Sequence, residues 1–181
     1  MVNRMTRQHW QGRISLVQGD ITKLRQIDVV VAAANELLAG GGGVDGAIHR
    51  AAGPELVVAS RKLAPCPAGQ ARITPGFELP AKFVIHAVGP IYSGSAGDGP
   101  TLASAYRSAL SLAAESDAKS IAFPCISTGV YGYPQDEAAN IAVDTVISWL
   151  SENESPQHVT FCCFLDADFQ IYRARLSDHG E

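Results

Sequence analysis

The sequence predicts an α/β fold, in which a mixed, mostly parallel central sheet lies between two layers of helices. Short runs rich in β-branched residues recur along the chain, and several are apolar throughout, which is typical of strands buried on both faces. Segments with helical periodicity lie between these runs, as expected when helices cover both faces of a sheet. The 181 residues suit one domain over residues 1–181, with a core at about 12–176.

The runs that we expect to form strands are residues 14–18, 29–33, 71–74, 83–88, 120–124 and 159–165. Apolar residues spaced three and four apart indicate two long helices, one beginning near Thr101 and one near Asp136. Further helices are expected over residues 44–52, 54–63 and 166–176. The stretch 64–68 is rich in Pro, and 93–99 is rich in Gly and Ser, so we predict a loop at each and an exposed, mobile tip at the second.

Composition excludes several classes of protein. The net charge of −4 and the lack of a basic run argue against electrostatic binding of nucleic acid, but not against a phosphate-containing ligand, which backbone amides can hold. No apolar run is long enough to span a membrane, and the polar segment Met1–Trp10 has no signal-peptide core, so we expect a cytoplasmic protein. The four cysteines are expected to be reduced. No clustered ligand spacing suggests a metal, and we expect no cofactor.

The first segment with chemical content is the glycine run at residues 40–43, followed by Val44, Asp45 and Gly46. Four consecutive glycines are costly in entropy, so the backbone must require close approach or positive φ there. The helix that follows offers free amides and a partial positive charge to an anion. A flexible connector between strand and helix is the alternative interpretation.

A second candidate loop covers residues 126–134, between an apolar strand and a clearly periodic helix. Ligands of open α/β sheets bind outside the carboxyl ends of the strands, and small residues with two glycines can direct successive amides at one diphosphate. Tyr131 lies between those glycines, where its ring could pack on a sugar. An ordinary strand-to-helix loop with a core tyrosine is the alternative. The loop lacks the Gly-Lys-Ser/Thr of a Walker loop.

Asp20 is a candidate because it follows the first strand. There it could accept from an exocyclic amine such as that of adenine. It could equally cap a helix that starts at Ile21, and its residue type favours the cap.

Asn35, Asp45 and His49 complete the set of candidates. Asp45 and His49 are four apart and share one helix face if that helix begins by Asp45. Asn35 ends the second strand near the glycine run, so the three side chains could orient a sugar and polarise water. A packed or solvated role is the alternative for His49. His86 lies in an apolar strand and is expected to be buried and structural.

These segments form a combination that is more specific than any one of them: residues 18–22, 33–35, 40–53, 66–69, 86–90 and 126–134. Together they resemble the macrodomain family, and within it the MacroD-type branch that includes bacterial ADP-ribose hydrolases. The resemblance covers nearly the whole chain, from about Ile14 to Leu176. It implies a three-layer fold with a mixed sheet, and ADP-ribose bound at the crest of that sheet.

The resemblance implies where the nucleotide would lie. Asp20 would take the adenine amine, with the Ile21 amide beside it. The two glycine-containing loops would hold the diphosphate through their main chain. The residues with this implied role are Gly42, Gly43 and Val44 in the first loop, and Ser127, Thr128, Gly129, Val130 and Tyr131 in the second.

Catalysis would take place at the distal ribose. The resemblance implies that Asn35 and Asp45 hold this ribose and the attacking water, with the Tyr131 ring against the sugar. His49 would be a supporting catalytic residue. Members of this branch hydrolyse O-acetyl-ADP-ribose and remove mono-ADP-ribose from acidic side chains. The implied partners are therefore ADP-ribose, its esters and mono-ADP-ribosylated proteins.

One residue departs from the family pattern. Where the family usually reads Asn-Ala-Ala-Asn, this chain reads Ala32-Ala33-Ala34-Asn35, so only the second asparagine is kept. If the first asparagine ties the loop backbone, hydrogen bonds of about 1 kcal/mol each are lost, and turnover falls while binding persists. Two alternatives to an ester hydrolase stay open: a binding module without catalysis, and a phosphatase acting on a phosphorylated distal ribose.

Overall fold

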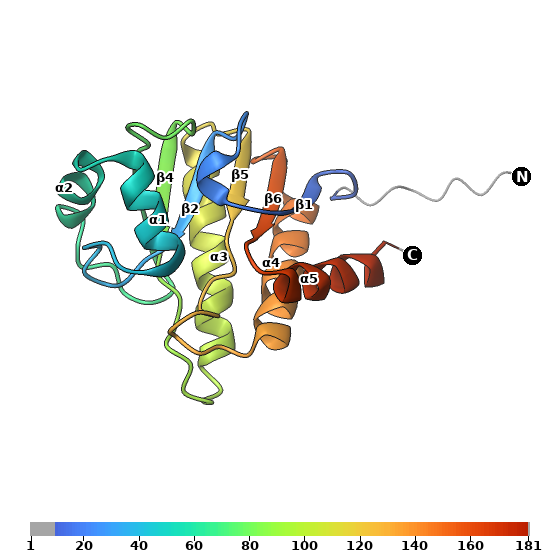
Figure 1. Cartoon of the computed structure of the whole chain (residues 1–181). Helices are drawn as coiled ribbons and strands as arrows, with labels where there is room; N and C mark the ends of the chain where they lie inside the picture. Colours follow the sequence, from blue (N-terminus) through green and yellow to red (C-terminus); the bar gives the residue numbers. More distant parts are fainter. Residues whose placement is uncertain (1–9, 181) are drawn as a thin grey trace, which may run out of the picture.

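The structure is a computed structural model that describes residues 10–180 (Figure 1). The strands are β1 (Ile14–Gln18), β2 (Val29–Ala33), β3 (Ala71–Pro75), β4 (Phe83–Ala87), β5 (Ser120–Phe123) and β6 (His158–Cys163). The helices are α1 (Gly43–Ala52), α2 (Glu55–Arg61), α3 (Asp98–Glu115), α4 (Gln135–Glu152) and α5 (Asp166–Asp178), with a 3₁₀ helix, η1 (Ile21–Lys23), after β1. Every predicted strand and helix is present, with ends within three residues of the predicted ones. The expectation for Met1–Trp10 lies almost entirely outside the described residues.

The six strands form one sheet in the order β1-β6-β5-β2-β4-β3. All neighbouring strands are parallel except β3, which runs antiparallel to β4. The prediction of a mixed, mostly parallel sheet is therefore confirmed. Within the described part of the chain, no helix is long and apolar enough to cross a membrane.

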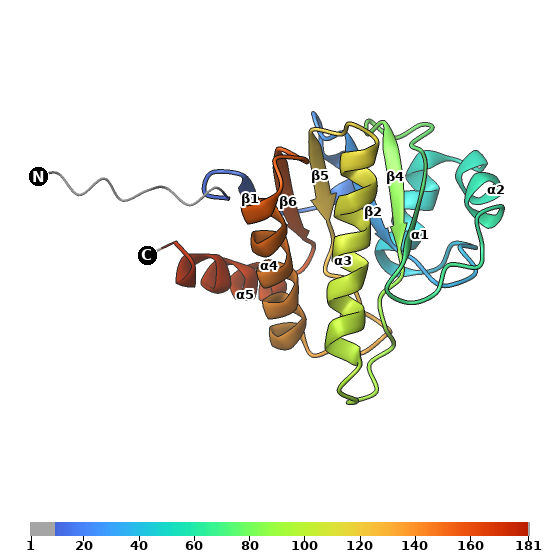
Figure 2. The same ribbon diagram turned by 180° about the vertical axis from the view of Figure 1, so that it is seen from behind.

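Helices cover both faces of this sheet, as predicted. α3, α4 and α5 pack on the face that Figure 2 shows, and α1 and α2 lie on the other face. In β2, Val29 and Val31 pack into the cluster under α3 and α4, whereas Val30 and Ala32 pack into the cluster under α1. Alternate residues of a strand point to opposite faces, so a central strand needs apolar residues at every position.

The long helix α3 begins earlier than its sequence suggested. The residues of its predicted apolar stripe are all buried, but the helix starts at Asp98, inside the stretch predicted to be a mobile loop. The Asp98 carboxylate accepts hydrogen bonds from the Ser93 hydroxyl and from the amides of Ser93 and Gly94. The loop is therefore shorter than predicted, and these bonds hold it against the start of the helix.

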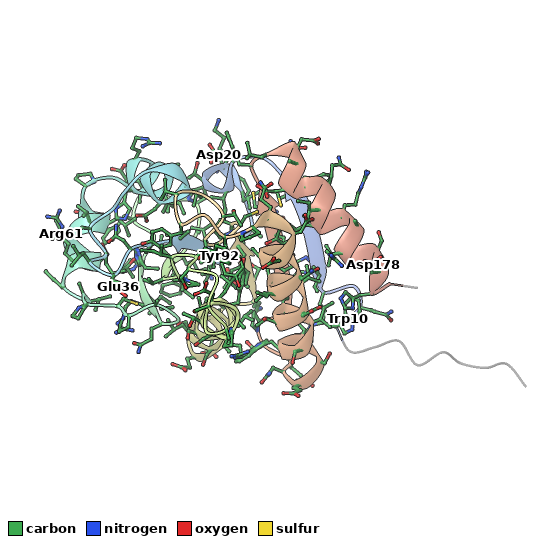
Figure 3. All side chains as sticks on the ribbon, turned by 90° about the horizontal axis from the view of Figure 1, so that it is seen from below. Trp10, Asp20, Glu36, Arg61, Tyr92 and Asp178 are labelled. Atoms are coloured by element: carbon green, nitrogen blue, oxygen red, sulfur yellow. The ribbon has the colours of Figure 1, made fainter. Side chains whose placement is uncertain are left out.

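The carboxyl ends of the five parallel strands lie at one edge of the sheet, and the segments that follow them meet there. β1 leads into Asp20, and β2 leads into the glycine loop (residues 40–46). β5 leads into the Tyr131 loop (residues 126–134), and β4 into the segment that contains Tyr92. Asp20 and Tyr92 are labelled in Figure 3, which views the molecule from this side.

Candidate functional site

The glycine loop connects β2 to the N-terminus of α1. Gly43 has a φ of 57°, a left-handed conformation that favours glycine. Gly46, in the first turn of α1, lies so close to Gly41 that a Cβ would collide with the Gly41 carbonyl oxygen. The backbone path therefore requires glycine at both positions, as the sequence predicted for this segment.

The Tyr131 loop folds back on itself between β5 and α4. The Gly132 amide donates to the Gly129 carbonyl, which forms a tight turn. Ser127 is buried with a φ of 68°, and its hydroxyl donates to the Pro90 carbonyl at 2.8 Å. These bonds fix the loop in a conformation that leaves the Val130 side chain fully exposed.

Both loops present backbone amides that the protein does not use internally. Among the described residues, no group accepts a hydrogen bond from the amides of residues 41–45 or of residues 127–131. The first set lies at the N-terminus of α1, where the helix dipole adds partial positive charge. Amides in this arrangement can hold an anion such as a diphosphate.

Asn35, which follows β2, and Ala32, which lies within it, have different surroundings. The Asn35 side chain closes the glycine loop, donating from Nδ2 to the Gly40 carbonyl (3.0 Å) and accepting at Oδ1 from the Ala39 amide (3.5 Å). Ala32 lies inside β2, fully buried beside His86 of β4. Asn35 therefore ties the loop backbone, and the departure at position 32 affects the core of the sheet.

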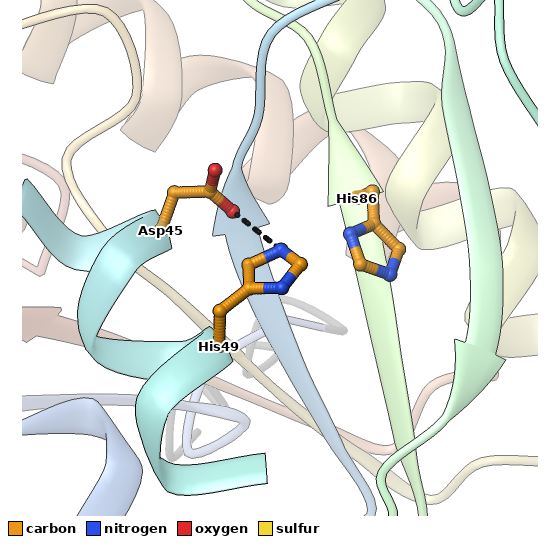
Figure 4. Close-up of side chains that lie close together, drawn as sticks. All are labelled: Asp45, His49 and His86. Atoms are coloured by element: carbon orange, nitrogen blue, oxygen red, sulfur yellow. Dashed lines mark ion pairs between the residues drawn. The ribbon is translucent and has the colours of Figure 1, made fainter. Parts of the chain in front are cut away.

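Asp45, His49 and His86 meet at the start of α1 (Figure 4). Asp45 and His49 lie one turn apart on one face of the helix, as predicted, with Oδ1 of Asp45 3.4 Å from Nε2 of His49. His86 reaches them from β4, and its ring centroid lies 6.1 Å from that of His49. The sequence predicted a buried His86, which is confirmed. Its place in this cluster was missed, because its neighbours come from other elements.

Burial sets the charge state of this cluster. It raises the pKa of the Asp45 carboxyl to about 6, because a charged carboxylate is poorly solvated there. Burial also lowers the pKa of His49, and it lowers that of His86 to about 4, with the His49 charge as the second cause. At neutral pH the cluster therefore contains an ionised Asp45 beside two neutral imidazoles, so the contact of 3.4 Å is not an ion pair.

Asp20 caps η1, which its residue type favoured. Its Oδ1 accepts hydrogen bonds from the Thr22 hydroxyl (2.7 Å) and amide (2.9 Å), and these lower the pKa of the Asp20 carboxyl. The Gly19 amide, just after β1, donates to the carbonyl of Cys163, the last residue of β6, at 2.9 Å. Phe164, the next residue after Cys163, therefore lies beside the end of β1. Phe164 is 76% exposed. Its exposure at this position was not predicted, although an aromatic residue at the end of an apolar strand is a usable signal.

The predicted site residues form two groups along the edge of the sheet. Asp20 and the buried Ile21 lie at the end of β1. The other predicted residues follow β2 and β5, and there burial and the charges of Glu36 and Asp45 raise the pKa of the Tyr131 phenol. β6 and β5 separate β1 from β2. With strands about 4.8 Å apart, the two groups are separated by about 14 Å.

The described residues contain one group that approaches the geometry of a metal site. One potential donor atom from each of Asp45, His49 and His86 lies within 4.8 Å of the other two. The expectation that the chain uses no metal stays a prediction. The four cysteines are free thiols, as predicted, and Sγ of Cys125 lies 3.7 Å from Sγ of Cys163.

The fold and these loops define an α/β protein with a candidate anion site at the carboxyl edge of its sheet. Comparison with known proteins narrows this class, because the Macro domain family matches residues 31–142. The chain is 53% identical over 169 residues to the ADP-ribose glycohydrolase MACROD2 of Xenopus laevis, an alignment that covers 92% of this chain and 40% of that protein. The chain belongs to the macrodomain family.

Two further proteins are similar over most of the chain. An O-acetyl-ADP-ribose deacetylase of Enterobacter cloacae is 51% identical over 174 residues, which are 93% of this chain and 96% of that protein. The macrodomain of Trypanosoma brucei, solved in complex with ADP-ribose, has a TM-score of 0.85 at 41% identity. That match covers 91% of this chain and 69% of the other chain.

Proposed function

We propose that this macrodomain binds ADP-ribose and hydrolyses its esters, namely O-acetyl-ADP-ribose and mono-ADP-ribose attached to acidic side chains, in the cytoplasm. The observation that carries the proposal is the set of unused amides in two adjacent loops, next to a buried carboxylate that is ionised at neutral pH. The names of the MACROD2 and deacetylase relatives agree with this activity.

The nucleotide end of the ligand would lie at β1 and β6. Both hydrogen bonds from Thr22 end on Oδ1 of Asp20, which leaves Oδ2 to accept from the adenine amine. The Ile21 amide lies beside it, and the exposed Phe164 ring offers a face on which adenine can stack. The distance of about 14 Å from β1 to β2 suits a ligand that consists of a nucleoside, a diphosphate and a second sugar.

The diphosphate and distal ribose would lie over β5 and β2. The unused amides of residues 41–45 and 127–131 would bind the diphosphate from two sides. The distal ribose would then lie between Asn35, Asp45 and the Tyr131 ring. Orientation by these contacts is the main source of rate in this proposal, and the amide dipoles stabilise the charge that develops.

Asp45 directs its two carboxylate oxygens to different surroundings. Oδ1 faces His49, whereas a Cβ added to Gly41 would lie 3.5 Å from Oδ2 of Asp45 and 3.7 Å from Nδ2 of Asn35. Oδ2 is therefore the oxygen that can orient a water molecule and the ribose hydroxyls.

In the reaction, the water oxygen adds to the ester carbon and the bond from that carbon to the ribose oxygen breaks. The products are a ribose hydroxyl and a carboxylic acid. A phosphate oxygen of the substrate can accept the proton of the water. The pKa of about 6 makes the Asp45 carboxylate a second candidate for this role.

The substitution Asp45→Ala tests the proposal. We expect hydrolysis to fall by about 100-fold or more, with ADP-ribose affinity largely kept, because the diphosphate is bound by backbone amides. Product analysis with O-acetyl-ADP-ribose and an ADP-ribosylated protein side by side measures the first effect, and calorimetry measures the second. An unchanged hydrolysis rate would reject the role of Asp45.

Binding has an independent check in the wild-type protein. ADP-ribose at about 100 times its Kd should stabilise the fold by roughly 2.7 kcal/mol, which raises the Tm by several degrees. No shift at millimolar ADP-ribose would exclude the whole proposal. Tight binding without product from either ester would select the binding module that Ala32 suggested. Phosphate release from ADP-ribose phosphate, with both esters intact, would select the phosphatase.

A further inference from the structure

Asp45 and His86 each contain a buried polar atom that the rest of the protein leaves unsatisfied. Among the described residues, neither Oδ1 of Asp45 nor Nδ1 of His86 has a hydrogen-bond partner. Both side chains are buried, and that of His86 is completely so. Such atoms are rare in proteins, because an unpaired buried donor or acceptor is costly. Two of them in one cluster indicate a polar group between them.

The other ring nitrogen of His86 determines what Nδ1 can do. Nε2 lies 2.9 Å from the Thr74 hydroxyl, which can donate its hydrogen to that nitrogen. When the hydroxyl donates, Nδ1 of the neutral ring carries the proton and is a donor. Figure 4 shows this nitrogen on the side of the ring that faces His49 and Asp45.

Ala32 is the residue of β2 that lies beside the His86 ring. It is the register partner of His86 on the adjacent parallel strand, so both side chains point to the face that α1 covers. Both are fully buried. Since Ala32 offers only a methyl group, Nδ1 of His86 finds no polar partner on β2.

We propose that Asp45, His49 and His86 bind one internal water molecule beside Ala32, and that His86 is a positioning residue that holds the Asp45 carboxylate through this water. One polar atom from each of the three residues lies within 4.8 Å of the other two, and a water with two tetrahedral hydrogen bonds of about 2.8 Å spans about 4.6 Å, which fits within this limit. A water held at Oδ1 leaves Oδ2 free for the substrate.

The groups around Asp45 indicate that hydrogen bonds, and not ion pairs, stabilise its ionised carboxylate. His49 on α1 and His86 on β4 lie close to this carboxylate, and its charge helps to raise the pKa of Tyr131 in the neighbouring loop. All three are neutral at neutral pH. The Arg50 side chain lies beside Gly46 on α1. Loss of the water-mediated donor should therefore raise the pH at which Asp45 ionises.

Two substitutions of similar volume at Ala32 test the water site without any enzymatic assay. Ala32→Asn supplies an amide that can replace the hydrogen bonds of the water, whereas Ala32→Val displaces the water and replaces nothing. We expect the Asn variant to have the higher Tm, by about 2–4 °C or more. This reverses the usual order, because valine is the better residue for a buried strand. A Val variant as stable as the Asn variant would overturn the water site, and so would stabilisation of the wild type by micromolar Zn²⁺.

A matched pair at His86 tests its role as a positioning residue, which rests on the proposed function. His86→Asn keeps a donor near the position of Nδ1, whereas His86→Gln keeps one only near Nε2. We expect the Gln variant to lower kcat for O-acetyl-ADP-ribose about tenfold, with KM changed less than twofold, and to move the acid limb of kcat about one pH unit higher. The Asn variant should recover most of this loss. Equal rates and pH profiles in the two variants would overturn the role.

Two further measurements keep this test decisive. If the wild type hydrolyses neither ester, the proposed function fails, and titration of the Asp45 carboxyl by ¹³C NMR still tests His86. The Asp45 pKa should be higher in the Gln variant than in the Asn variant, and equal values would overturn the inference. If neither variant folds, Thr74→Val is the substitute. It leaves the His86 ring in place but removes the hydroxyl that, by donating to Nε2, keeps the proton on Nδ1. It should move the acid limb upward, and an unmoved limb would overturn the role.

Discussion

Asp45 is a buried carboxylate that the proposed reaction needs in its charged form. Its side chain is almost inaccessible to solvent, and this burial raises its pKa to about 6. A carboxylate with that pKa can accept a proton near neutral pH and release it again. Asp20, whose pKa is lowered by its hydrogen bonds to Thr22, lacks this property. Burial is thus the physical reason why the Asp45 carboxyl is suited to proton transfer and that of Asp20 is not.

Ester hydrolysis should therefore show an acid limb near pH 6. Below this pH Asp45 is protonated in the free enzyme, so kcat/KM for O-acetyl-ADP-ribose should fall about tenfold per pH unit, and above it the value should level off. Initial rates between pH 4.5 and 8.5 measure this profile, with calorimetric ADP-ribose binding over the same range as the control. A level rate down to pH 5 would exclude Asp45 as the essential ionised group.

The residues of the site differ in how far the sequence could predict them. Asp45 and His49 share a helix face through a spacing of four, which is a local relationship and visible in the sequence. His86 reaches the same cluster through the pairing of β2 with β4, and no local pattern encodes that pairing. The departure at Ala32 was visible in the sequence. Its surroundings became clear only once β2 and β4 were aligned.

At the scale of secondary-structure elements, the fold was predictable wherever one local pattern dominated. The apolar run of β2 predicted a central strand, and its observed bounds, Val29–Ala33, match the prediction. The prediction was poorest at the start of α3, where a Gly- and Ser-rich composition indicated a loop. Asp98 overrides this composition through its hydrogen bonds to Ser93 and Gly94, which depend on the loop folding back.

The substitution Gly46→Ala should damage the glycine loop. The added Cβ collides with the Gly41 carbonyl oxygen, and backbone cannot move aside as a flexible side chain can. The loop amides should then be displaced, so ADP-ribose affinity measured by calorimetry should fall by about tenfold or more, equivalent to about 1.4 kcal/mol. An affinity equal to that of the wild type would show that the loop does not depend on this close approach.

Gly99→Ala is the matched control, because Gly99 is also helical but lies in α3. Its added Cβ would meet Ile141 at 3.6 Å and the Tyr133 hydroxyl at 3.7 Å, which are ordinary contacts. We expect ADP-ribose affinity to be kept and stability to be equal to that of the wild type or higher by about 0.5–1 kcal/mol.

At the scale of the whole molecule, Asp45 and His86 give the fold opposite responses to acid. The pKa of Asp45 is raised from 3.8 to about 6 on folding, so the native protein binds more protons than the unfolded chain between these values. Its contribution to stability is present below about pH 4 and is lost as the pH rises through 6. The pKa of His86 is lowered from 6.5 to about 4, so its contribution is present above pH 6.5 and is lost toward pH 4.

Removing one of these groups should reveal the response of the other. Each shift corresponds to a contribution on the order of 3 kcal/mol, and the two largely cancel between pH 4 and 6.5 in the wild type. Asp45→Asn buries no charge, so its free energy of unfolding should exceed that of the wild type at pH 7.5, and this gain should disappear by pH 4. His86→Gln should instead lose less stability than the wild type as the pH falls from 6.5 to 4.

Urea unfolding at pH 7.5, 6, 5 and 4 measures these differences. Asp20 and Asp98 have pKa values lowered by hydrogen bonds, so they destabilise the wild type and both variants equally in acid, and the differences between the proteins isolate Asp45 and His86. Parallel pH curves for all three proteins would show that burial does not shift these two groups. Curves that diverge in opposite directions would show that the fold gives up stability at neutral pH to keep a charged Asp45 at its site.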